Sequence, residues 1–362
     1  MAKHDLFIVS DPLSSEFGPT RPAILVAEEL SKQNFHVKII SITIAKEIRK
    51  LFESKGISVF EIVGKASSMD QSLAWFKAWF SEALFSSNSR KTPQLNGIVL
   101  NFSNVIAVPS SFWYAQGPPT VTLHNMKAAL PWHYSLIYNF GAPLFEFLDK
   151  RAVKKFARIA SRVIVNSKYL MSVYNEFGIK VHDVIYPPLD CELFKPGASK
   201  RSSDYTLSYF GKETKVSILK KLADLGVKIK LFGGKMTAIP QKIRQHPNLT
   251  LLGRVSNEKL VELYSNALFT LYPFLDEPFG YIPVESMACG VPVLTFNLQG
   301  PRESVIHGLT GWLVDSDKTF IDLALRLWKN GYTSTMRRRC RERALTFDKK
   351  EIAERWVQLL RN

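Results

Sequence analysis

Two glutamates stand eight residues apart in the segment EPFGYIPVESMACGVPV, at positions 277 and 285. The proline after Glu277 favours an extended or turn conformation, whereas Pro283 suits the first turn of a helix. Gly290 suits the left-handed residue that follows a helix. The segment therefore predicts a loop, a short helix and a strand. Glu277 and Glu285 are candidates for a general acid/base pair or for hydrogen bonding to a polyol, although spacing alone favours two solvated residues.

A pair of lysines follows another predicted strand. Lys212 and Lys215 come directly after Gly211, at the end of the strand TLSYFG, and precede a predicted helix at 216–226. Ammonium groups beside a helix start attract anions, because the first N–H groups of the helix have no partner within it. The segment is a candidate phosphate site, and an ordinary solvated turn is the alternative.

Two further polar positions suggest chemistry. His124 lies near the end of a predicted strand at 119–125, where the ligand sites of parallel sheets collect; a structural histidine fits the same pattern. Asp315 and Asp317 have the Asp-x-Asp spacing of some metal ligands, but Asp317 fits better as the N-cap of the following helix. The sequence therefore predicts no metal site.

The composition is that of a globular protein. A chain of 362 residues exceeds one ordinary core, so two domains are expected. The net charge of +16 favours acidic partners such as nucleotide phosphates, nucleic acid or an anionic membrane. Three widely spaced cysteines suit a reducing cytosol, and the first apolar run is too short for a signal peptide. The interrupted apolar stretch 128–148 predicts a packed or membrane-touching segment rather than a span.

The elements that must position these residues follow one pattern twice. In the first half, predicted strands at 6–10 and 36–41 enclose a predicted helix at 23–33, which is the βαβ unit of a parallel sheet. Further strands are predicted at 57–63, 97–103, 119–125 and 162–167.

A second series of alternating strands and helices begins after a boundary rich in Pro, Gly and Ser at 184–205. We predict an N-terminal domain at 1–186 and a C-terminal domain at 187–347. Each would have a doubly wound, Rossmann-like α/β sheet, and ligands would bind in a cleft between the two domains.

The ordered series of motifs resembles the retaining glycosyltransferases of family four, which have the GT-B fold, over nearly the whole chain. The resemblance rests on VIYPPLDCELFKP (184–196), which is similar to the family's inter-domain passage, on EPFGYIPVESMACGVPVLTF (277–296), which is similar to its Glu-x7-Glu signature, and on LQGPRESVIHGLTGWLV (298–314). It implies two Rossmann-like domains that face each other across a cleft, with a C-terminal helix at 348–362 that packs back onto the first domain.

The resemblance also implies a role for each motif residue. Glu277 would hold hydroxyls of the donor sugar, and Glu285 would bind the nucleotide ribose. Lys212 and Lys215 would neutralise the leaving diphosphate, which replaces a metal ion, and His124 would lie beside the anomeric carbon. Further donor contacts are implied for Gly18, Gly211, Arg254, Val255, Phe279, Gly280 and Tyr281.

The implied function is the transfer of a hexose or related sugar, with retention, from a UDP- or GDP-linked donor to a glycan acceptor. Neither a metal nor another cofactor is expected. A nucleotide-sugar epimerase or a phosphorylase of the same fold is the enzymatic alternative. A nucleic-acid-binding protein is the alternative of another class, suggested only by charge and by the basic cluster at 337–343; without an RNA-binding signature, no nucleic acid partner is expected.

Two predicted helices of the N-terminal domain concern the acceptor. The aromatic-rich segment 72–85 and the basic segment 149–162 suit a membrane surface and a polyprenyl-phosphate- or lipid-linked glycan. A core-facing aromatic stripe and a solvated basic face explain the same residues equally well. The membrane interpretation implies a cytoplasmic protein bound peripherally at the cytosolic membrane face.

Overall fold

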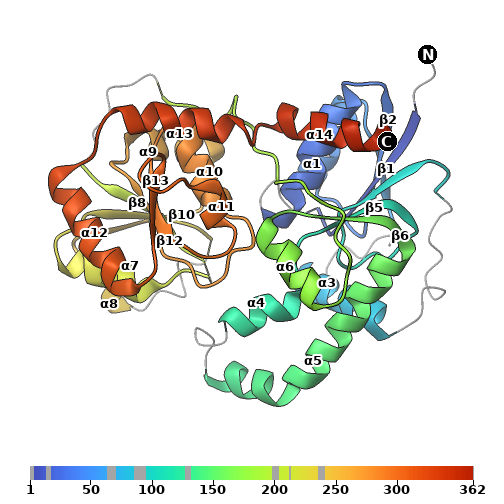
Figure 1. The fold of residues 1–362 in the computed structure, drawn as a ribbon, viewed down its shortest axis with the longest axis horizontal. Coiled ribbons are helices and arrows are strands. Elements are labelled where there is room, and N and C mark those ends of the chain that lie inside the picture. Colours follow the sequence, from blue (N-terminus) through green and yellow to red (C-terminus); the bar gives the residue numbers. More distant parts are fainter. Residues whose placement is uncertain are drawn as a thin grey trace. The chain divides into compact units, whose positions relative to one another are not determined.

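A computed structural model describes residues 4–13, 18–62, 71–84, 95–126, 132–197, 204–211, 213–234 and 241–361. The described chain divides into two compact units. The first unit takes the residues up to His124, residues 132–188 and the C-terminal segment from Lys349, whereas the second takes Leu189–Asp348 together with Asn125 and Met126. Each unit is an α/β domain with its own sheet (Figure 1).

The first unit is built on a parallel sheet with the strand order β3-β2-β1-β4-β5-β6-β7. Its strands are β1 (His4–Ser10), β2 (Phe35–Ser41), β3 (Ser58–Glu61), β4 (Ile98–Asn101), β5 (Ser110–Ala115), β6 (Ala160–Val165) and β7 (Asp183–Val184). Its helices are the 3-10 turn η1 (Gly18–Thr20), α1 (Arg21–Ser31), α2 (Lys46–Ser54), α3 (Gln71–Leu84), α4 (Pro119–Met126), α5 (Trp132–Ile159), α6 (Lys168–Glu176) and α14 (Lys349–Arg361).

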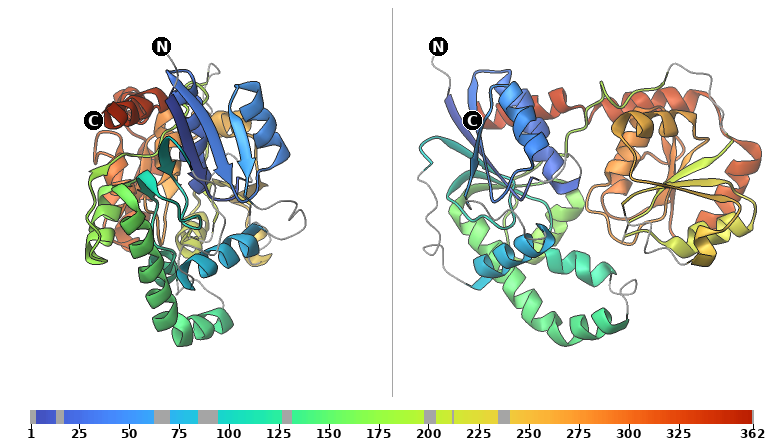
Figure 2. Two further views of the ribbon diagram at one scale, coloured as in Figure 1. Left: turned by 90° about the vertical axis from the view of Figure 1, so that its right-hand side faces the viewer. Right: turned by 180° about the vertical axis from the view of Figure 1, so that it is seen from behind.

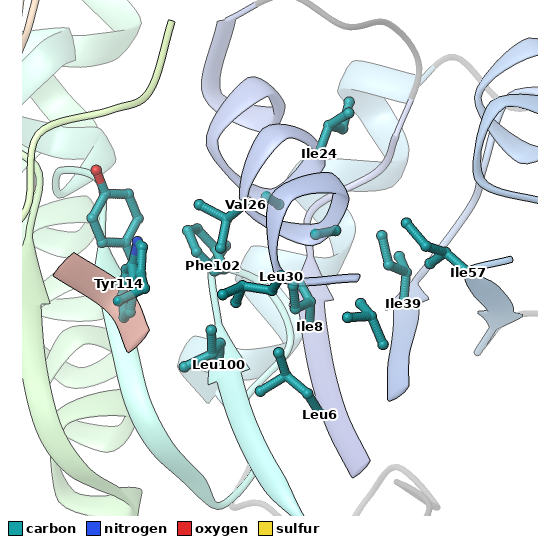
Figure 3. Close-up of a cluster of buried hydrophobic side chains, with 14 of the residues drawn as sticks. Leu6, Ile8, Ile24, Val26, Leu30, Ile39, Ile57, Leu100, Phe102 and Tyr114 are labelled. Atoms are coloured by element: carbon teal, nitrogen blue, oxygen red, sulfur yellow. The ribbon is translucent and has the colours of Figure 1, made fainter. Parts of the chain in front are cut away.

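One face of this sheet is covered by α1 and by the C-terminal helix α14. Leu30 of α1 lies beside Ile8 of β1 in the core cluster drawn in Figure 3. Trp356 of α14 completes that cluster, because its ring packs against Phe102 and Tyr114 at centroid distances of 5.5 and 5.6 Å. The predicted return of the C-terminal helix to the first domain is therefore confirmed.

The other face is covered by α3 and α5, which pack against each other. Trp79 and Ala83 of α3 share a core cluster with Leu148 and Ala152 of α5. Helix α5 has 28 residues, so it is much longer than the predicted basic helix, and its first half projects beyond the sheet of this unit (Figures 1 and 2). In the parts of the chain that the structure describes, no helix is long and apolar enough to cross a bilayer.

The predicted strand at 119–125 is wrong, because these residues form α4. Pro119 suits the first helical position, and Asp149 of α5 accepts hydrogen bonds from both the N–H and the hydroxyl of Thr120 at the helix start. This buried cap outweighs the strand preference of the β-branched residues in the segment. The strand that pairs with β4 and β6 is instead β5, which the prediction lacks.

The second unit has a parallel sheet with the order β10-β9-β8-β11-β12-β13 and helices on both faces (Figure 2). Its strands are β8 (Thr206–Tyr209), β9 (Ile229–Phe232), β10 (Leu249–Gly253), β11 (Thr270–Tyr272), β12 (Val293–Phe296) and β13 (Gly311–Val314). Its helices are α7 (Val216–Asp224), α8 (Gln241–Arg244), α9 (Asn257–Asn266), α10 (Tyr281–Ala288), α11 (Pro301–Ser304), α12 (Asp317–Asn330) and α13 (Thr335–Leu345). The doubly wound prediction is confirmed for both units.

Candidate functional site

The candidate site lies at the carboxyl edge of the second sheet, where the strand order reverses between β8 and β11. Such a switch point is the usual ligand position in a doubly wound sheet. The loop after β8 is joined to the loop after β11 by backbone hydrogen bonds, from the Lys215 N–H to the Pro273 carbonyl at 2.7 Å and from the Leu275 N–H to the Glu213 carbonyl at 2.6 Å. The two motif-bearing loops therefore form one structure. Lys212 lies outside the described residues.

Glu277 is held in place through four separate groups. Its carboxylate accepts hydrogen bonds from the Tyr272 hydroxyl and, at 3.0 Å, from the Gly280 N–H. Its own N–H donates to the Gln299 side-chain oxygen at 2.6 Å, and its carbonyl accepts the Gly300 N–H at 3.1 Å. Both the backbone and the carboxylate of this half-buried residue are thus fixed before any ligand binds.

The environment of Glu277 raises the pKa of its carboxyl group to about 7. Burial is the largest cause, because it disfavours the charged form, and the nearby negative charges of Glu213 and Asp276 act in the same direction. The hydrogen bonds from Tyr272 and the backbone oppose the rise. Glu277 therefore titrates near neutral pH.

The start of α10 directs backbone N–H groups toward this carboxylate. Gly280 is the N-cap of α10 and has a left-handed backbone, with φ of 91° and ψ of 80°, which only glycine adopts without strain. Phe279 and Gly280 are buried and Tyr281 is half-buried. A helix start with this geometry is suited to an anion or to a sugar hydroxyl.

Glu285 lies inside α10 and is almost completely buried, at 3% exposure. The Tyr264 hydroxyl donates to one of its carboxylate oxygens at 3.1 Å. Burial and the charges of Glu213, Glu277 and Glu285 raise the pKa of Tyr209, at the end of β8. All three carboxylates therefore act electrostatically on the Tyr209 hydroxyl.

Arg254 and Gly211 lie at the same edge of the sheet. Arg254 follows β10, and its guanidinium lies so close to Gly234 that a β-carbon there would be 2.8 Å from the Arg254 Nε. Gly211 is buried, and a β-carbon on it would lie 2.4 Å from the Tyr209 ring and 2.6 Å from a Glu213 carboxylate oxygen. Gly234 thus leaves space for the Arg254 side chain, and Gly211 leaves space for those of Tyr209 and Glu213.

Lys215 is paired within the second unit. Its ammonium group donates to Asp317 at 2.9 Å and lies 4.4 Å from the centre of the Phe296 ring. The predicted N-cap role of Asp317 is wrong. The N-cap of α12 is Ser316, which forms a capping box with Thr319. The carboxylate of Asp317 instead serves as the partner of Lys215.

The remaining predicted site residues are less closely connected to Glu277. Val255 is half-buried between β10 and α9. Gly18 and His124 belong to the first unit, and both are exposed. Gly18 opens η1 with φ of 69°, whereas His124 lies in the last turn of α4 rather than at a strand end.

Three residues around Glu277 were not singled out from the sequence. Tyr272 ends β11, Asp276 lies in the loop after it, and Gln299 lies in the turn after β12. Only the Tyr272 position, at a strand end close to a motif carboxylate, offered a signal. Among the described residues, no group of three or more His, Cys, Asp or Glu side chains is arranged to hold a metal ion.

Sequence comparison finds one matching family model and several curated relatives. The family model "Glycosyl transferases group 1" matches residues 218–347. The alpha-1,3/1,6-mannosyltransferase ALG2 of Mus musculus is 29% identical in an alignment 224 residues long, which covers 48% of this chain and 54% of that protein. The D-inositol 3-phosphate glycosyltransferase of Mycolicibacterium smegmatis is 27% identical in an alignment 200 residues long, which covers 48% of this chain and 45% of that protein. The chain thus spans about half the length of these curated relatives.

Structural comparison covers the whole chain. The crystal structure of Anabaena Alr3699/HepE in complex with UDP and glucose is similar, with a TM-score of 0.70 and 17% sequence identity, over 99% of this chain and all of that one. At this identity the likeness establishes the fold. The whole chain thus has the GT-B fold, and its C-terminal domain matches the family model of the glycosyl transferases group 1.

Proposed function

We propose that the chain is a retaining glycosyltransferase that moves a hexose or related sugar from a UDP- or GDP-linked donor to a glycan acceptor without a metal ion. The observation that carries the proposal is the fixed Glu277 carboxylate at the switch point of the second sheet, beside the loop of Lys215. The names of the relatives support the reaction class. A UDP- and glucose-bound structural neighbour supports the type of donor.

In this proposal the donor lies along the carboxyl edge of the second sheet. Glu277 accepts hydrogen bonds from sugar hydroxyls, and the N–H groups of residues 279–281 face the sugar and the phosphates. Glu285 holds the ribose, with Tyr264 fixing one of its oxygens. Gly211, Arg254 and Val255 flank the nucleotide, whereas Gly18 and His124 contribute from the first unit, His124 beside the anomeric carbon.

Departure of the diphosphate is the step that needs cationic groups. Cleavage of the sugar–phosphate bond places negative charge on the phosphate, which Lys212 and Lys215 neutralise. Lys215 exchanges Asp317 for the phosphate. Separation of the Lys215–Asp317 pair costs little free energy, because a half-exposed ion pair contributes about 1 kcal/mol or less. The acceptor hydroxyl attacks from the face that the diphosphate leaves, and a phosphate oxygen takes its proton.

The acceptor is proposed to be a lipid-linked glycan at the cytosolic face of a membrane. The support is a surface that we name the α3–α5 apolar face. On α3 the exposed residues Phe76, Phe80 and Leu84 recur at helical spacing, and on α5 Phe140, Leu144 and Phe147 do the same. The two stripes adjoin, because Arg151, the next residue on the α5 stripe, donates to the Leu84 carbonyl at 3.3 Å.

Charge supports the choice of an anionic membrane for this face. Among the described residues of α3 and α5, the exposed charged side chains are one carboxylate, Glu146, and the cations Lys77, Lys150, Arg151, Lys154 and Arg158. Exposed aromatic groups fringed by cations suit the interface of an anionic bilayer. The alternative of a core-facing stripe holds for other residues of the same helix, since Trp79 is buried.

A turnover panel of nucleotide-sugars, with and without EDTA, tests the proposed function. We expect one UDP- or GDP-sugar to be consumed in the presence of acceptor, with EDTA without effect, and Glu277→Ala to abolish transfer in a folded protein. Glu262→Ala is the matched control, because Glu262 is exposed and pairs only with Lys259 among the interactions described.

Other outcomes identify the alternatives. Conversion of the donor without acceptor indicates an epimerase, and a pyridoxal phosphate chromophore indicates a phosphorylase. Salt-dependent nucleic acid binding without nucleotide-sugar binding contradicts the transferase proposal. Loss of activity in EDTA contradicts metal independence alone.

A further inference from the structure

Gln299 has an unusual backbone conformation. Its φ is 50°, and it is the single non-glycine residue with a positive φ in the part of the chain that the structure describes. A left-handed backbone costs an L-residue about 1–2 kcal/mol, which glycine avoids and which asparagine tolerates best among the others. A turn alone would therefore favour glycine at this position, so the glutamine side chain needs a separate explanation.

The side chain of Gln299 contacts two consecutive residues of the Glu277 loop. Its oxygen accepts the Glu277 N–H at 2.6 Å, and its NH₂ group donates to the Asp276 carboxylate at 3.1 Å. One partner only donates and the other, when ionised, only accepts. A glutamine side chain can hydrogen-bond to both the Glu277 N–H and the Asp276 carboxylate. A glutamate could accept only from the N–H, and an asparagine is too short to reach both partners.

The backbone beside Gln299 holds the same loop. The Gly300 N–H donates to the Glu277 carbonyl at 3.1 Å. A β-carbon on Gly300 would lie 2.3 Å from the Phe279 Cα and 2.4 Å from the Pro278 carbonyl oxygen, so the two turns are in direct contact. The turn at 299–300 thus binds both backbone groups of Glu277.

We propose that Gln299 is a positioning residue for the Glu277 carboxylate. By fixing the peptide between Asp276 and Glu277, it orients the Glu277 side chain so that one oxygen meets the Tyr272 hydroxyl and the other meets the Gly280 N–H. The effect of Gln299 on turnover rests on the proposed function, whereas its effect on the loop does not.

The first test is Gln299→Asn, which keeps an amide and tolerates the left-handed backbone but is one methylene shorter. We expect kcat to fall 10- to 100-fold, because displacement of a reacting or binding group by about 1 Å has effects of that size. The dissociation constant of UDP or GDP should stay within twofold, and Tm should change little. Asn297→Ala is the control, since Asn297 lies in the same turn but donates to Asp315.

The second test is Gln299→Glu, which has the correct length and accepts the Glu277 N–H but places a negative charge beside Asp276. We expect the acidic limb of the pH–activity profile to move to higher pH, with no such movement in Asn297→Ala. A purely structural role would lower Tm, nucleotide affinity and kcat together and would leave the limb in place, and that result would overturn the proposal. Wild-type turnover in Gln299→Asn would overturn it as well.

A third readout needs no activity. Amide hydrogen exchange at Glu277 and Gly280 should be faster in Gln299→Asn than in the wild-type protein. If the wild-type protein binds no nucleoside diphosphate, the proposed function fails while this measurement still decides the positioning role. Unchanged exchange at both amides would overturn the role of Gln299 by itself.

Discussion

Glu277 combines burial, a dense set of hydrogen-bond donors and neighbouring negative charge. Burial disfavours the ionised carboxyl group more strongly than the Tyr272 hydroxyl and the backbone N–H stabilise it, so its pKa rises to about 7. A carboxyl group poised near neutral pH is typical of functional sites. Whether Glu277 is charged therefore depends on conditions within the physiological range.

The first prediction concerns activity and pH. If the ionised Glu277 accepts hydrogen bonds from the donor sugar, kcat/KM falls as pH falls below about 7, because the protonated carboxyl loses acceptor capacity. Glu277→Gln should lower kcat/KM by about 100-fold or more and remove this acidic limb. A variant that keeps both the turnover and the limb would exclude Glu277 from the site.

The second prediction concerns stability and pH. The pKa of Glu277 is about 7 in the folded protein against a usual value of 4.5, so the folded state binds this proton more tightly than the unfolded state. Its contribution to the free energy of unfolding is complete below pH 4.5 and is lost as pH rises to 7. Relative to wild type, Glu277→Gln should gain stability across this range, by about 3 kcal/mol at most.

Chemical denaturation of both proteins from pH 4 to pH 8 measures that gain. Because other carboxyl groups titrate in both proteins alike, the difference between the two free energies isolates Glu277. A difference that stays constant with pH would show that the folded protein leaves this pKa near its ordinary value.

At the scale of elements, the site depends on two turns that touch each other. The turn that opens α10 and the turn that opens α11 meet at Gly300, whose Cα faces the backbone of residues 278–279. A third turn, between β8 and α7, is joined to the first by the Lys215 and Leu275 N–H groups. The three turns follow β11, β12 and β8, which are neighbours in the sheet.

The third prediction tests that contact. Gly300→Ala places a methyl group against backbone atoms on the facing turn, which cannot move as a side chain does. We expect a loss of about 1–3 kcal/mol in the free energy of unfolding, together with reduced turnover. In Gly197→Ala, the new methyl group meets Ser265 at 3.4 Å, an ordinary contact, so a comparable loss there would contradict the explanation.

Local patterns predicted the elements that are stabilised locally. The βαβ unit of β1, α1 and β2 and the loop–helix–strand order of α10 and β12 follow from alternation and from Pro and Gly positions. Residues 119–125 were predicted wrongly because a distant side chain, Asp149, caps α4. Glu277 was predicted from its motif, whereas Gln299 was not, because its contacts come from a close approach of two turns.

At the scale of the whole molecule, charge and exposed apolar area have a common interpretation. The net charge is +16, and cations surround the α3–α5 apolar face. Phe140, at 88% exposure, is the most exposed large apolar residue among the described side chains. Contiguous apolar surfaces of this kind mark interaction sites in proteins.

The fourth prediction is binding to anionic vesicles. We expect cosedimentation with vesicles that contain phosphatidylglycerol, weaker binding to phosphatidylcholine alone, and a decrease with salt. Replacement of Phe140 and Phe147 by Ser should reduce binding at least tenfold. Leu225→Ser is the control, because Leu225 is an exposed apolar residue of the second unit. Equal binding by all of these proteins would exclude the face as a membrane contact.

The most direct test of the central claim is a crystal structure with UDP or GDP bound. The account predicts that the diphosphate lies at the carboxyl edge of the second sheet, between the loop that leads to Lys215 and the start of α10, with Lys215 released from Asp317. Density for the nucleotide at any other place on the protein, with these two loops empty, would contradict it.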